Sequence, residues 1–118
     1  MPTKKVLLIC AFAVMFLVAS QAAMAQKPKR ITFKRGASSA TVTGRIGANG
    51  YLEYLINGRE GQLMSIDITS GNGQVIVNAG TASGKNFSLD MTGGDHLLSI
   101  VNQRKTATTY TLRVSIKN

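Results

Sequence analysis

The adjacent residues Asp95 and His96 are the first candidates for catalysis, because His96 is the single histidine of the chain. A serine hydrolase needs an acid that orients its histidine towards a serine. Asp95 and His96 lie next to each other in a segment with strand character, where neighbouring side chains point to opposite faces. The acid could not orient the ring in that arrangement, and no nucleophile-elbow motif is present. We therefore interpret His96 as an ordinary residue near the edge of a strand.

The sequence also offers few residues for a metal site or for catalysis by paired carboxylates. One histidine and five acidic residues show no spacing typical of metal ligands, so we expect no metal and no cofactor. A general acid–base pair needs two converging carboxylates, and Glu53 and Asp67 could face each other on neighbouring strands, but nothing in their spacing requires it. The glycines precede no helix whose N-terminus could bind phosphate, so we interpret them as turns. We predict no catalytic residue and a protein that is not an enzyme.

The sequence is instead rich in basic side chains. Fourteen Lys and Arg against five Asp and Glu give a formal net charge of +9. One interpretation is a solvated, solubilising surface, and the other is attraction to anionic partners such as lipid headgroups or acidic cell-wall polymers. We expect no nucleic acid, because the few aromatic residues that would have to interleave with the cations are needed for the core. The cations cluster at Lys27, Lys29, Arg30, Lys34 and Arg35, and again at Arg104 and Lys105.

The first residues have the pattern of a cleavable signal peptide. Lys4 and Lys5 precede an apolar run over 6–18, and Ala23-Met24-Ala25 gives the small-x-small motif of a cleavage site. The run is shorter than the roughly 20 residues that span a bilayer. We predict cleavage after Ala25, with an uncleaved anchor and a lipoprotein at Cys10 as the alternatives. No second apolar stretch follows, so we expect no transmembrane segment after signal cleavage.

Cleavage would leave a small, basic, cysteine-free chain, residues 26–118. Without Lys4 and Lys5, twelve basic residues remain against five acidic ones, a net charge of +7. Cys10 is the only cysteine and leaves with the signal peptide, so disulfides cannot stabilise the exported domain. We therefore expect a periplasmic or secreted protein, and the lack of disulfides favours a bacterial periplasm.

The sequence pattern over residues 31–118 predicts one all-β domain, and we expect a flexible basic leader at 26–30 before it. Apolar residues alternate with polar ones at Met64-Ile66-Ile68, at Leu52-Tyr54-Ile56 and along 110–116, and no window shows a sustained helical period. Asn57-Gly58, Gly71-Asn72-Gly73 and Gly93-Gly94-Asp95 are typical of tight turns. We predict a small antiparallel β-sandwich or jelly roll of about eight strands. The expected strands are 31–33, 41–43, 52–56, 63–69, 75–77, 87–89, 97–101 and 109–116.

Several short motifs resemble a known family, the periplasmic inhibitors of goose-type lysozyme. The resemblance spans nearly all of the mature chain, mainly at turn and core positions, and the family is related in outline to β-sandwich modules of secreted peptidases. The matching motifs are Phe33-x-x-Gly36-x-Ser38-Ser39-Ala40, Gly44-x-Ile46, Tyr51-x-x-Tyr54, Gly61-Gln62 and Tyr110-x-Leu112-x-Val114.

The resemblance implies a lysozyme inhibitor that inserts two loops into the substrate cleft of the enzyme. In that family tyrosine and arginine side chains of the loops make the contacts. The corresponding loops here are 47–50 and 102–108. Arg104, followed by Lys105, falls where an inhibitory arginine would lie, whereas Asn49 stands at the position of the inserting tyrosine and Tyr51 is the nearest aromatic residue. The alternatives are an accessory module that binds anionic cell-envelope polymers through its basic surface, and association through an exposed sheet edge.

Overall fold

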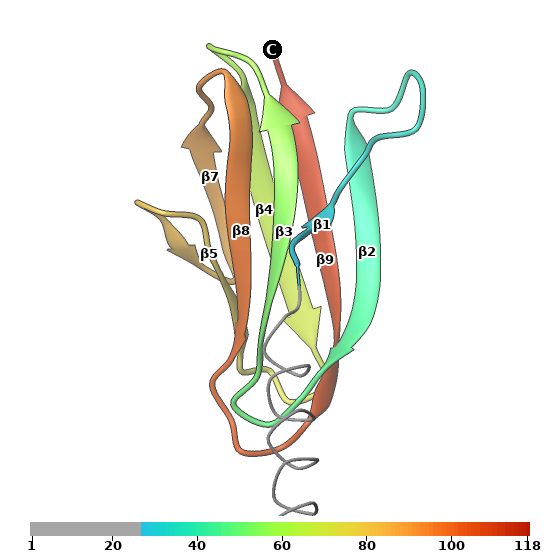
Figure 1. Ribbon diagram of the computed structural model, residues 1–118, viewed down its shortest axis with the longest axis vertical. Coiled ribbons are helices and arrows are strands. Elements are labelled where there is room, and N and C mark those ends of the chain that lie inside the picture. Colours follow the sequence, from blue (N-terminus) through green and yellow to red (C-terminus); the bar gives the residue numbers. More distant parts are fainter. Residues whose placement is uncertain (1–26) are drawn as a thin grey trace, which may run out of the picture.

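The computed structural model describes residues 27–118, which form two β-sheets packed around one core (Figure 1). The predicted signal peptide, residues 1–25, lies outside this described part. Over 27–118 every regular element is a strand, so these residues contain no apolar helix that could cross a membrane. The strands are β1 (Lys29–Arg30), β2 (Ser39–Ile46), β3 (Tyr51–Gly58), β4 (Leu63–Ser70), β5 (Val75–Asn78), β6 (Ser83–Gly84), β7 (Asn86–Asp90), β8 (Gly94–Asn102) and β9 (Thr108–Lys117).

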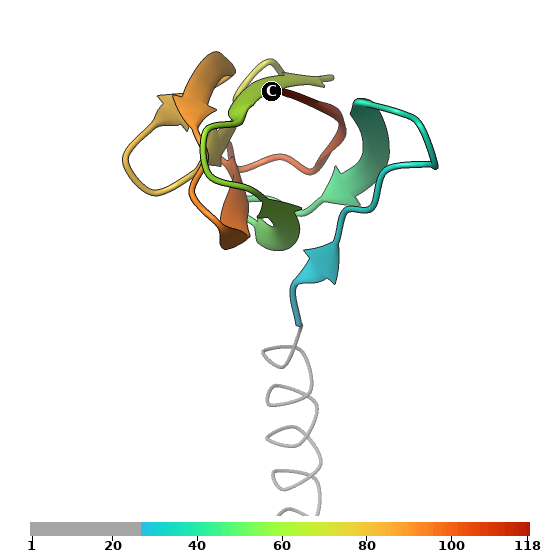
Figure 2. The same ribbon diagram turned by 90° about the horizontal axis from the view of Figure 1, so that it is seen from above.

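The strand order confirms the predicted all-β sandwich. One sheet has the order β1-β3-β8-β5-β6 and the other β2-β9-β4-β7. Every pairing is antiparallel except that of β1 with β3, which is parallel and departs from the expectation of antiparallel sheets alone. Seen along the strands, β1 and β2 lie on the same side of the sandwich, although they belong to different sheets (Figure 2).

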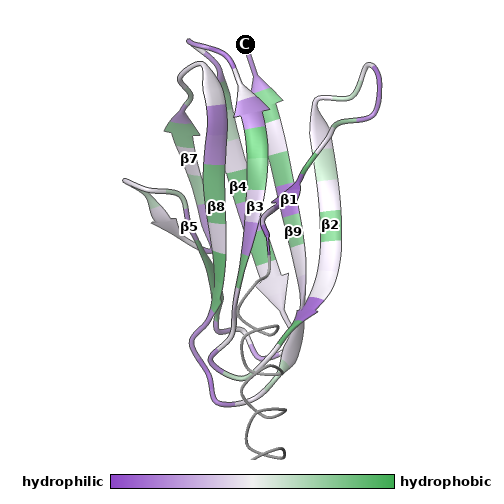
Figure 3. Ribbon diagram, in the orientation of Figure 1, coloured by the Kyte–Doolittle hydropathy of each residue, from purple (hydrophilic) through white to green (hydrophobic). Residues whose placement is uncertain are grey.

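The core forms because apolar and polar residues alternate along the long strands (Figure 3). Met64, Ile66 and Ile68 of β4 are buried, as the period-2 pattern predicts, and the intervening residues are more exposed. Tyr110, Leu112 and Val114 of β9 are buried in the same way. The remaining buried apolar residues come from both sheets and the connections: Ile31, Ile46, Tyr54, Ile56, Val75, Val77, Met91, Leu98 and Ile100.

The start of the domain differs from the prediction. Residues 31–33 do not form a strand; instead Lys29 and Arg30, expected in the leader, form β1 against Tyr54 and Leu55 of β3. The backbone N–H of Ile31 continues this pairing with a hydrogen bond of 2.8 Å to the carbonyl oxygen of Leu55. Arg30 fixes the strand through a bidentate ion pair, with its guanidinium nitrogens 2.8 and 2.7 Å from the Asp95 carboxylate oxygens.

The turn expected at Asn57-Gly58 also lies elsewhere. Asn57 and Gly58 remain within β3 and pair with Asp95 and Gly94 of β8, so the prediction of a turn there is wrong. The turn follows at 59–62, which Gln62 closes through its backbone N–H to the Arg59 carbonyl oxygen at 3.2 Å. Gly58 is a close-approach position, since a Cβ there would collide with the side chain of Met91. The two-residue strand β6 was not expected from the sequence.

Candidate functional site

Three loops meet at one end of the sandwich, and we call this region the loop end. They are the β2–β3 loop (47–50), the β4–β5 loop (71–74) and the β8–β9 loop (103–107), at the lower end of the molecule in Figure 1. Figure 3 shows this end to be largely hydrophilic. Two of these loops are the ones that the sequence singled out.

The β2–β3 loop is a tight turn with a left-handed residue near its tip. The backbone N–H of Gly50 donates to the Gly47 carbonyl oxygen at 2.9 Å and closes the turn. Asn49 has a φ of 49° and is the one non-glycine residue of the described chain with a positive φ. Asparagine adopts this conformation more readily than most residues, including tyrosine. The asparagine at this position therefore fits the backbone that the turn requires.

The loops at 47–50 and 103–107 are hydrogen-bonded directly to each other. The backbone N–H of Asn49 donates to the carbonyl oxygen of Arg104 at 2.7 Å. The N–H of Asn102, at the end of β8, donates to the Gly50 carbonyl oxygen at 3.0 Å. The β4–β5 loop joins through the N–H of Gln103, which donates to the Gln74 carbonyl oxygen at 3.0 Å. Consequently the three loops form one connected surface.

Asn102 is the side chain that holds this surface together, and sequence reasoning missed it. It is 1% exposed, and its Nδ2 donates to the carbonyl oxygens of Gly47 at 2.9 Å and Thr106 at 2.8 Å. Its Oδ1 accepts from the backbone N–H of Arg104 at 3.1 Å and from Nδ2 of Asn72 at 3.2 Å. Both donor hydrogens and the acceptor oxygen are thus used. The sequence signal is an asparagine two residues before Arg104, the spacing of an Asx turn.

All four residues predicted for partner binding lie at the loop end. Asn49, Arg104 and Lys105 are exposed loop residues. Tyr51 is the first residue of β3, pairs with Val101 of β8 and is 57% exposed, the most exposed of the large apolar side chains in the described part. Their role in binding stays a prediction, but the geometry gathers them on neighbouring, solvent-facing positions.

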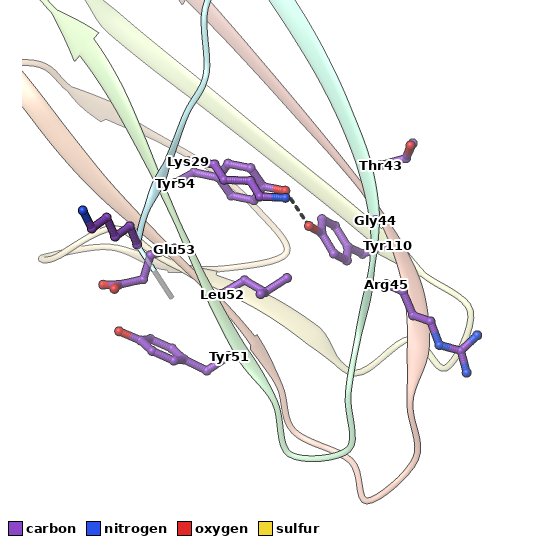
Figure 4. Close-up of a pocket in the computed structure, with 10 residues that line it drawn as sticks. Lys29, Thr43, Gly44, Arg45, Tyr51, Leu52, Glu53, Tyr54 and Tyr110 are labelled. Atoms are coloured by element: carbon purple, nitrogen blue, oxygen red, sulfur yellow. Dashed lines mark hydrogen bonds between the residues drawn. The ribbon is translucent and has the colours of Figure 1, made fainter. Parts of the chain in front are cut away.

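The Glu53 carboxylate is the acidic group beside Tyr51. The two side chains are two residues apart on β3, so they point to the same face, and Figure 4 draws the carboxylate next to the phenol. Hydrogen bonding to this carboxylate is the main cause that raises the pKa of Tyr51. The phenol is therefore neutral at physiological pH and can donate a hydrogen bond.

The residues considered for catalysis are not brought together. The Asp95 carboxylate is held by Arg30 and accepts a hydrogen bond of 3.2 Å from Nδ2 of Asn57, whereas Nε2 of His96 lies 2.9 Å from the Thr92 carbonyl oxygen. In the described residues no three metal-ligating side chains are gathered.

Glu53 and Asp67 do not face each other on neighbouring strands. Glu53 is on β3 and Asp67 on β4, which belong to different sheets. The Asp67 carboxylate instead accepts a hydrogen bond of 3.0 Å from Nδ2 of Asn86, on the neighbouring strand β7.

The fold is a small two-sheet β-sandwich, and several solved structures are similar to it. The periplasmic inhibitor of g-type lysozyme from Aeromonas hydrophila, PliG, is similar with a TM-score of 0.70 and 18% identity over 77% of this chain and 96% of that one. The PliG of Salmonella Typhimurium gives 0.61 and 19% over 79% and 100%. The fold resemblance expected from the sequence is therefore confirmed.

The same fold also occurs outside the inhibitors. The pre-peptidase C-terminal domain of a collagenase from Bacillus anthracis is similar with a TM-score of 0.60 and 18% identity, over 78% of this chain and 96% of that one. No protein-family model matches the chain, and no curated protein matches it. A fold shared by inhibitors and peptidase modules does not by itself determine function, so the function has to be argued from the site.

Proposed function

We propose that this protein is a periplasmic inhibitor of goose-type lysozyme that binds the enzyme through its loop end. The observation that carries the proposal is the pair of exposed loops, 47–50 and 103–107, joined by the hydrogen bond from Asn49 to Arg104. The similarity in fold to inhibitors from two bacteria supports the same assignment.

Arg104 supplies the chemistry that a lysozyme cleft would recognise. Glycoside hydrolases cut with carboxyl groups that flank the scissile bond. An exposed guanidinium at the tip of a loop can pair with such a carboxylate in two parallel hydrogen bonds and occupy the place of the substrate. Lys105 adds a second cation beside it, at a position suited to the rim of the interface.

Tyr51 and Asn102 supply the other two requirements of a tight inhibitor. Exposed aromatic side chains bury a large area at little cost in conformational entropy, and they are common anchors of interfaces. Asn102 holds the backbone of both loops before the enzyme arrives, so little ordering remains to be done on binding. The loop end therefore combines a charged tip, an aromatic anchor and a preorganised backbone.

The test is the residual activity of goose-type, chicken-type and invertebrate-type lysozymes on bacterial cell walls, titrated with the purified protein at physiological salt. We expect stoichiometric loss of goose-type activity. An unchanged activity of that enzyme at a large molar excess of the protein would overturn the proposal.

The dependence of binding on salt concentration distinguishes this proposal from the alternative, in which a diffuse basic surface binds anionic cell-envelope polymers. Attraction between exposed charges is screened over about 8 Å at physiological ionic strength, so polymer binding should fall steeply as salt rises. An enzyme–inhibitor contact with shape complementarity should persist. Inhibition that disappears between low and physiological salt would favour the polymer interpretation.

A further inference from the structure

A cleft of about 700 Å³ opens between β3 and β2, on the side of the sandwich where the two sheets end. β1 pairs only with Tyr54 and Leu55, so it leaves the edge of β3 at 51–53 uncovered. The volume falls within the roughly 300–1,000 Å³ that is typical of small-molecule sites. Because β2 belongs to the other sheet, the cleft reaches inward between the sheets towards β9.

All three tyrosines of the chain line this cleft (Figure 4). Tyr51 is at its mouth, while Tyr54 of β3 and Tyr110 of β9 are buried at its floor. Gly44 of β2 makes room for the Tyr110 ring, since a Cβ at this position would lie 2.6 Å from the Tyr110 hydroxyl. Tyr54 and Tyr110 thus meet at the floor, with Tyr51 at the rim, and the cleft pairs apolar surface with hydrogen-bonding hydroxyl groups.

The buried hydroxyl groups of Tyr54 and Tyr110 form a polar floor with unused capacity. Their oxygens are 2.5 Å apart and share one hydrogen bond. Whichever hydroxyl accepts this bond keeps its own proton, and over 27–118 neither hydroxyl makes another side-chain bond. Burial raises the pKa of Tyr110, so the pair stays protonated at physiological pH. The floor can therefore donate one hydrogen bond to an acceptor on a ligand.

Positive charge surrounds the cleft. Lys29 of β1 pairs with Tyr54 in register and lines the cleft. Lys27 and Arg45 also line the cleft, and Glu53 is its single acidic lining residue. The one salt bridge of the described residues joins Arg30 to Asp95, so none of these three cations is neutralised by an ion pair there. The excess of positive charge around the cleft favours an anionic ligand.

We propose that this cleft binds a small sugar that carries a carboxylate. Leu52 and the exposed ring of Tyr51 provide apolar surface against which a sugar ring can pack, Lys29 pairs with the carboxylate, and the hydroxyl pair donates to a ligand oxygen. A phosphate alone would leave the apolar surface unused, and a neutral sugar would leave Lys29 unpaired. The cleft shares Tyr51 with the loop end but is otherwise formed away from the tips of the loops, and ligand binding there does not depend on lysozyme inhibition.

The experiment is a titration of the purified, isotope-labelled protein with four compounds, followed by amide NMR shifts and calorimetry. Two are acidic disaccharides, one with a muramic acid and one with a uronic acid, which distinguish cell-wall glycan from acidic polysaccharide as the source. The others are neutral chitobiose and inorganic phosphate. We expect at least one acidic disaccharide to shift the signals of Gly44, Leu52 and Tyr110 at lower concentration than either control.

Variants test whether the cleft is the binding site. Lys29→Gln should weaken binding of the acidic disaccharide by about tenfold, the effect of removing one charge-assisted hydrogen bond. Lys34→Gln, an equal change of charge in the exposed 31–38 connection, should leave the affinity unchanged, and so should Arg104→Ala. Tyr110→Phe, checked for folding by its NMR spectrum, should also weaken binding.

Four outcomes would overturn the proposal. They are equal binding of chitobiose and the acidic disaccharides, binding of phosphate as tight as that of the sugars, equal losses in Lys29→Gln and Lys34→Gln, and no shift at millimolar concentration. None of them bears on lysozyme inhibition, which the activity titration measures separately.

Discussion

The backbone N–H of Asn49 lies 2.7 Å from the carbonyl oxygen of Arg104 and joins two loops that are 55 residues apart in sequence. Because this contact involves only main-chain atoms, it leaves the side chains of both residues free to face a partner. The loop end therefore has a hydrogen-bonded backbone and side chains that can face a partner, an arrangement suited to a binding surface at the end of a β-sandwich.

Replacing Arg104 by alanine should weaken inhibition of goose-type lysozyme without unfolding the protein. Arg104 is exposed, so the free energy of unfolding should change by less than about 0.5 kcal/mol. Loss of an arginine anchor should raise the inhibition constant by at least about tenfold. Arg59→Ala, the same change in the turn at the opposite end of the sandwich, is the matched control. Equal inhibition by the two variants would show that Arg104 makes no contact with the enzyme.

Replacing Asn102 by alanine should both destabilise the protein and loosen the loop end. The change removes four side-chain hydrogen bonds and leaves buried carbonyl and amide groups unpaired. We expect a loss of about 2–4 kcal/mol in the free energy of unfolding, measured by urea denaturation. Inhibition should weaken as well, although Asn102 is too buried to contact an enzyme. A loss below about 0.5 kcal/mol would contradict the organising role of this side chain.

The ion pair between Arg30 and Asp95 should make stability depend on pH on the acid side. Hydrogen bonding to Arg30, and then to Asn57, lowers the pKa of Asp95 in the folded protein. A lowered pKa stabilises the fold above the ordinary aspartate value of about 4, and this stabilisation is lost as the pH falls towards the folded-state value. The urea midpoint of the wild type should therefore fall between about pH 5 and pH 2 more than that of Asp95→Asn. Parallel curves for the two proteins would contradict this assignment.

The Tyr54–Tyr110 pair should make stability depend on pH on the alkaline side. Burial, and then the hydrogen bond to Tyr54, raises the pKa of Tyr110. A raised pKa contributes stability that is complete below the ordinary tyrosine value of about 10 and is lost at higher pH. Absorbance of tyrosinate should show Tyr110 still protonated when an exposed tyrosine has ionised, and Tyr110→Phe should lose less stability above about pH 10. Ionisation of all three tyrosines in one step near pH 10 would contradict a buried pair.

The layers of the fold were predictable because side-chain direction alternates with a period of two. Met64, Ile66 and Ile68 marked the buried face of β4, and the alternation needs no knowledge of the partner strands. Pairing of the strands was not predictable in the same way. β1 pairs with β3, and its Arg30 meets Asp95, 65 residues away, whereas nothing in the local sequence of Lys29 and Arg30 indicates a strand.

The candidate site was predictable in part. The resemblance to the inhibitor family identified the loop 47–50, and Arg104 stood out as a cation in the loop before the last strand. The connection between the loops depends on Asn102, whose partners include Gly47 and Asn72, 55 and 30 residues away in the chain. The cleft could not be predicted from the sequence either, because Tyr54 and Tyr110 come together only when the two sheets pack against each other. Tertiary contacts of this kind leave little trace in a single sequence.

The most direct test of the central claim is a hydrogen-exchange footprint of the protein with and without goose-type lysozyme at physiological salt. Our account predicts that amides of residues 47–51 and 103–107 become protected in the complex, while those of the opposite turn at 59–62 exchange as before. Protection confined to the sheet faces or to the β1–β2 side, or no protection at a saturating enzyme concentration, would contradict binding through the loop end.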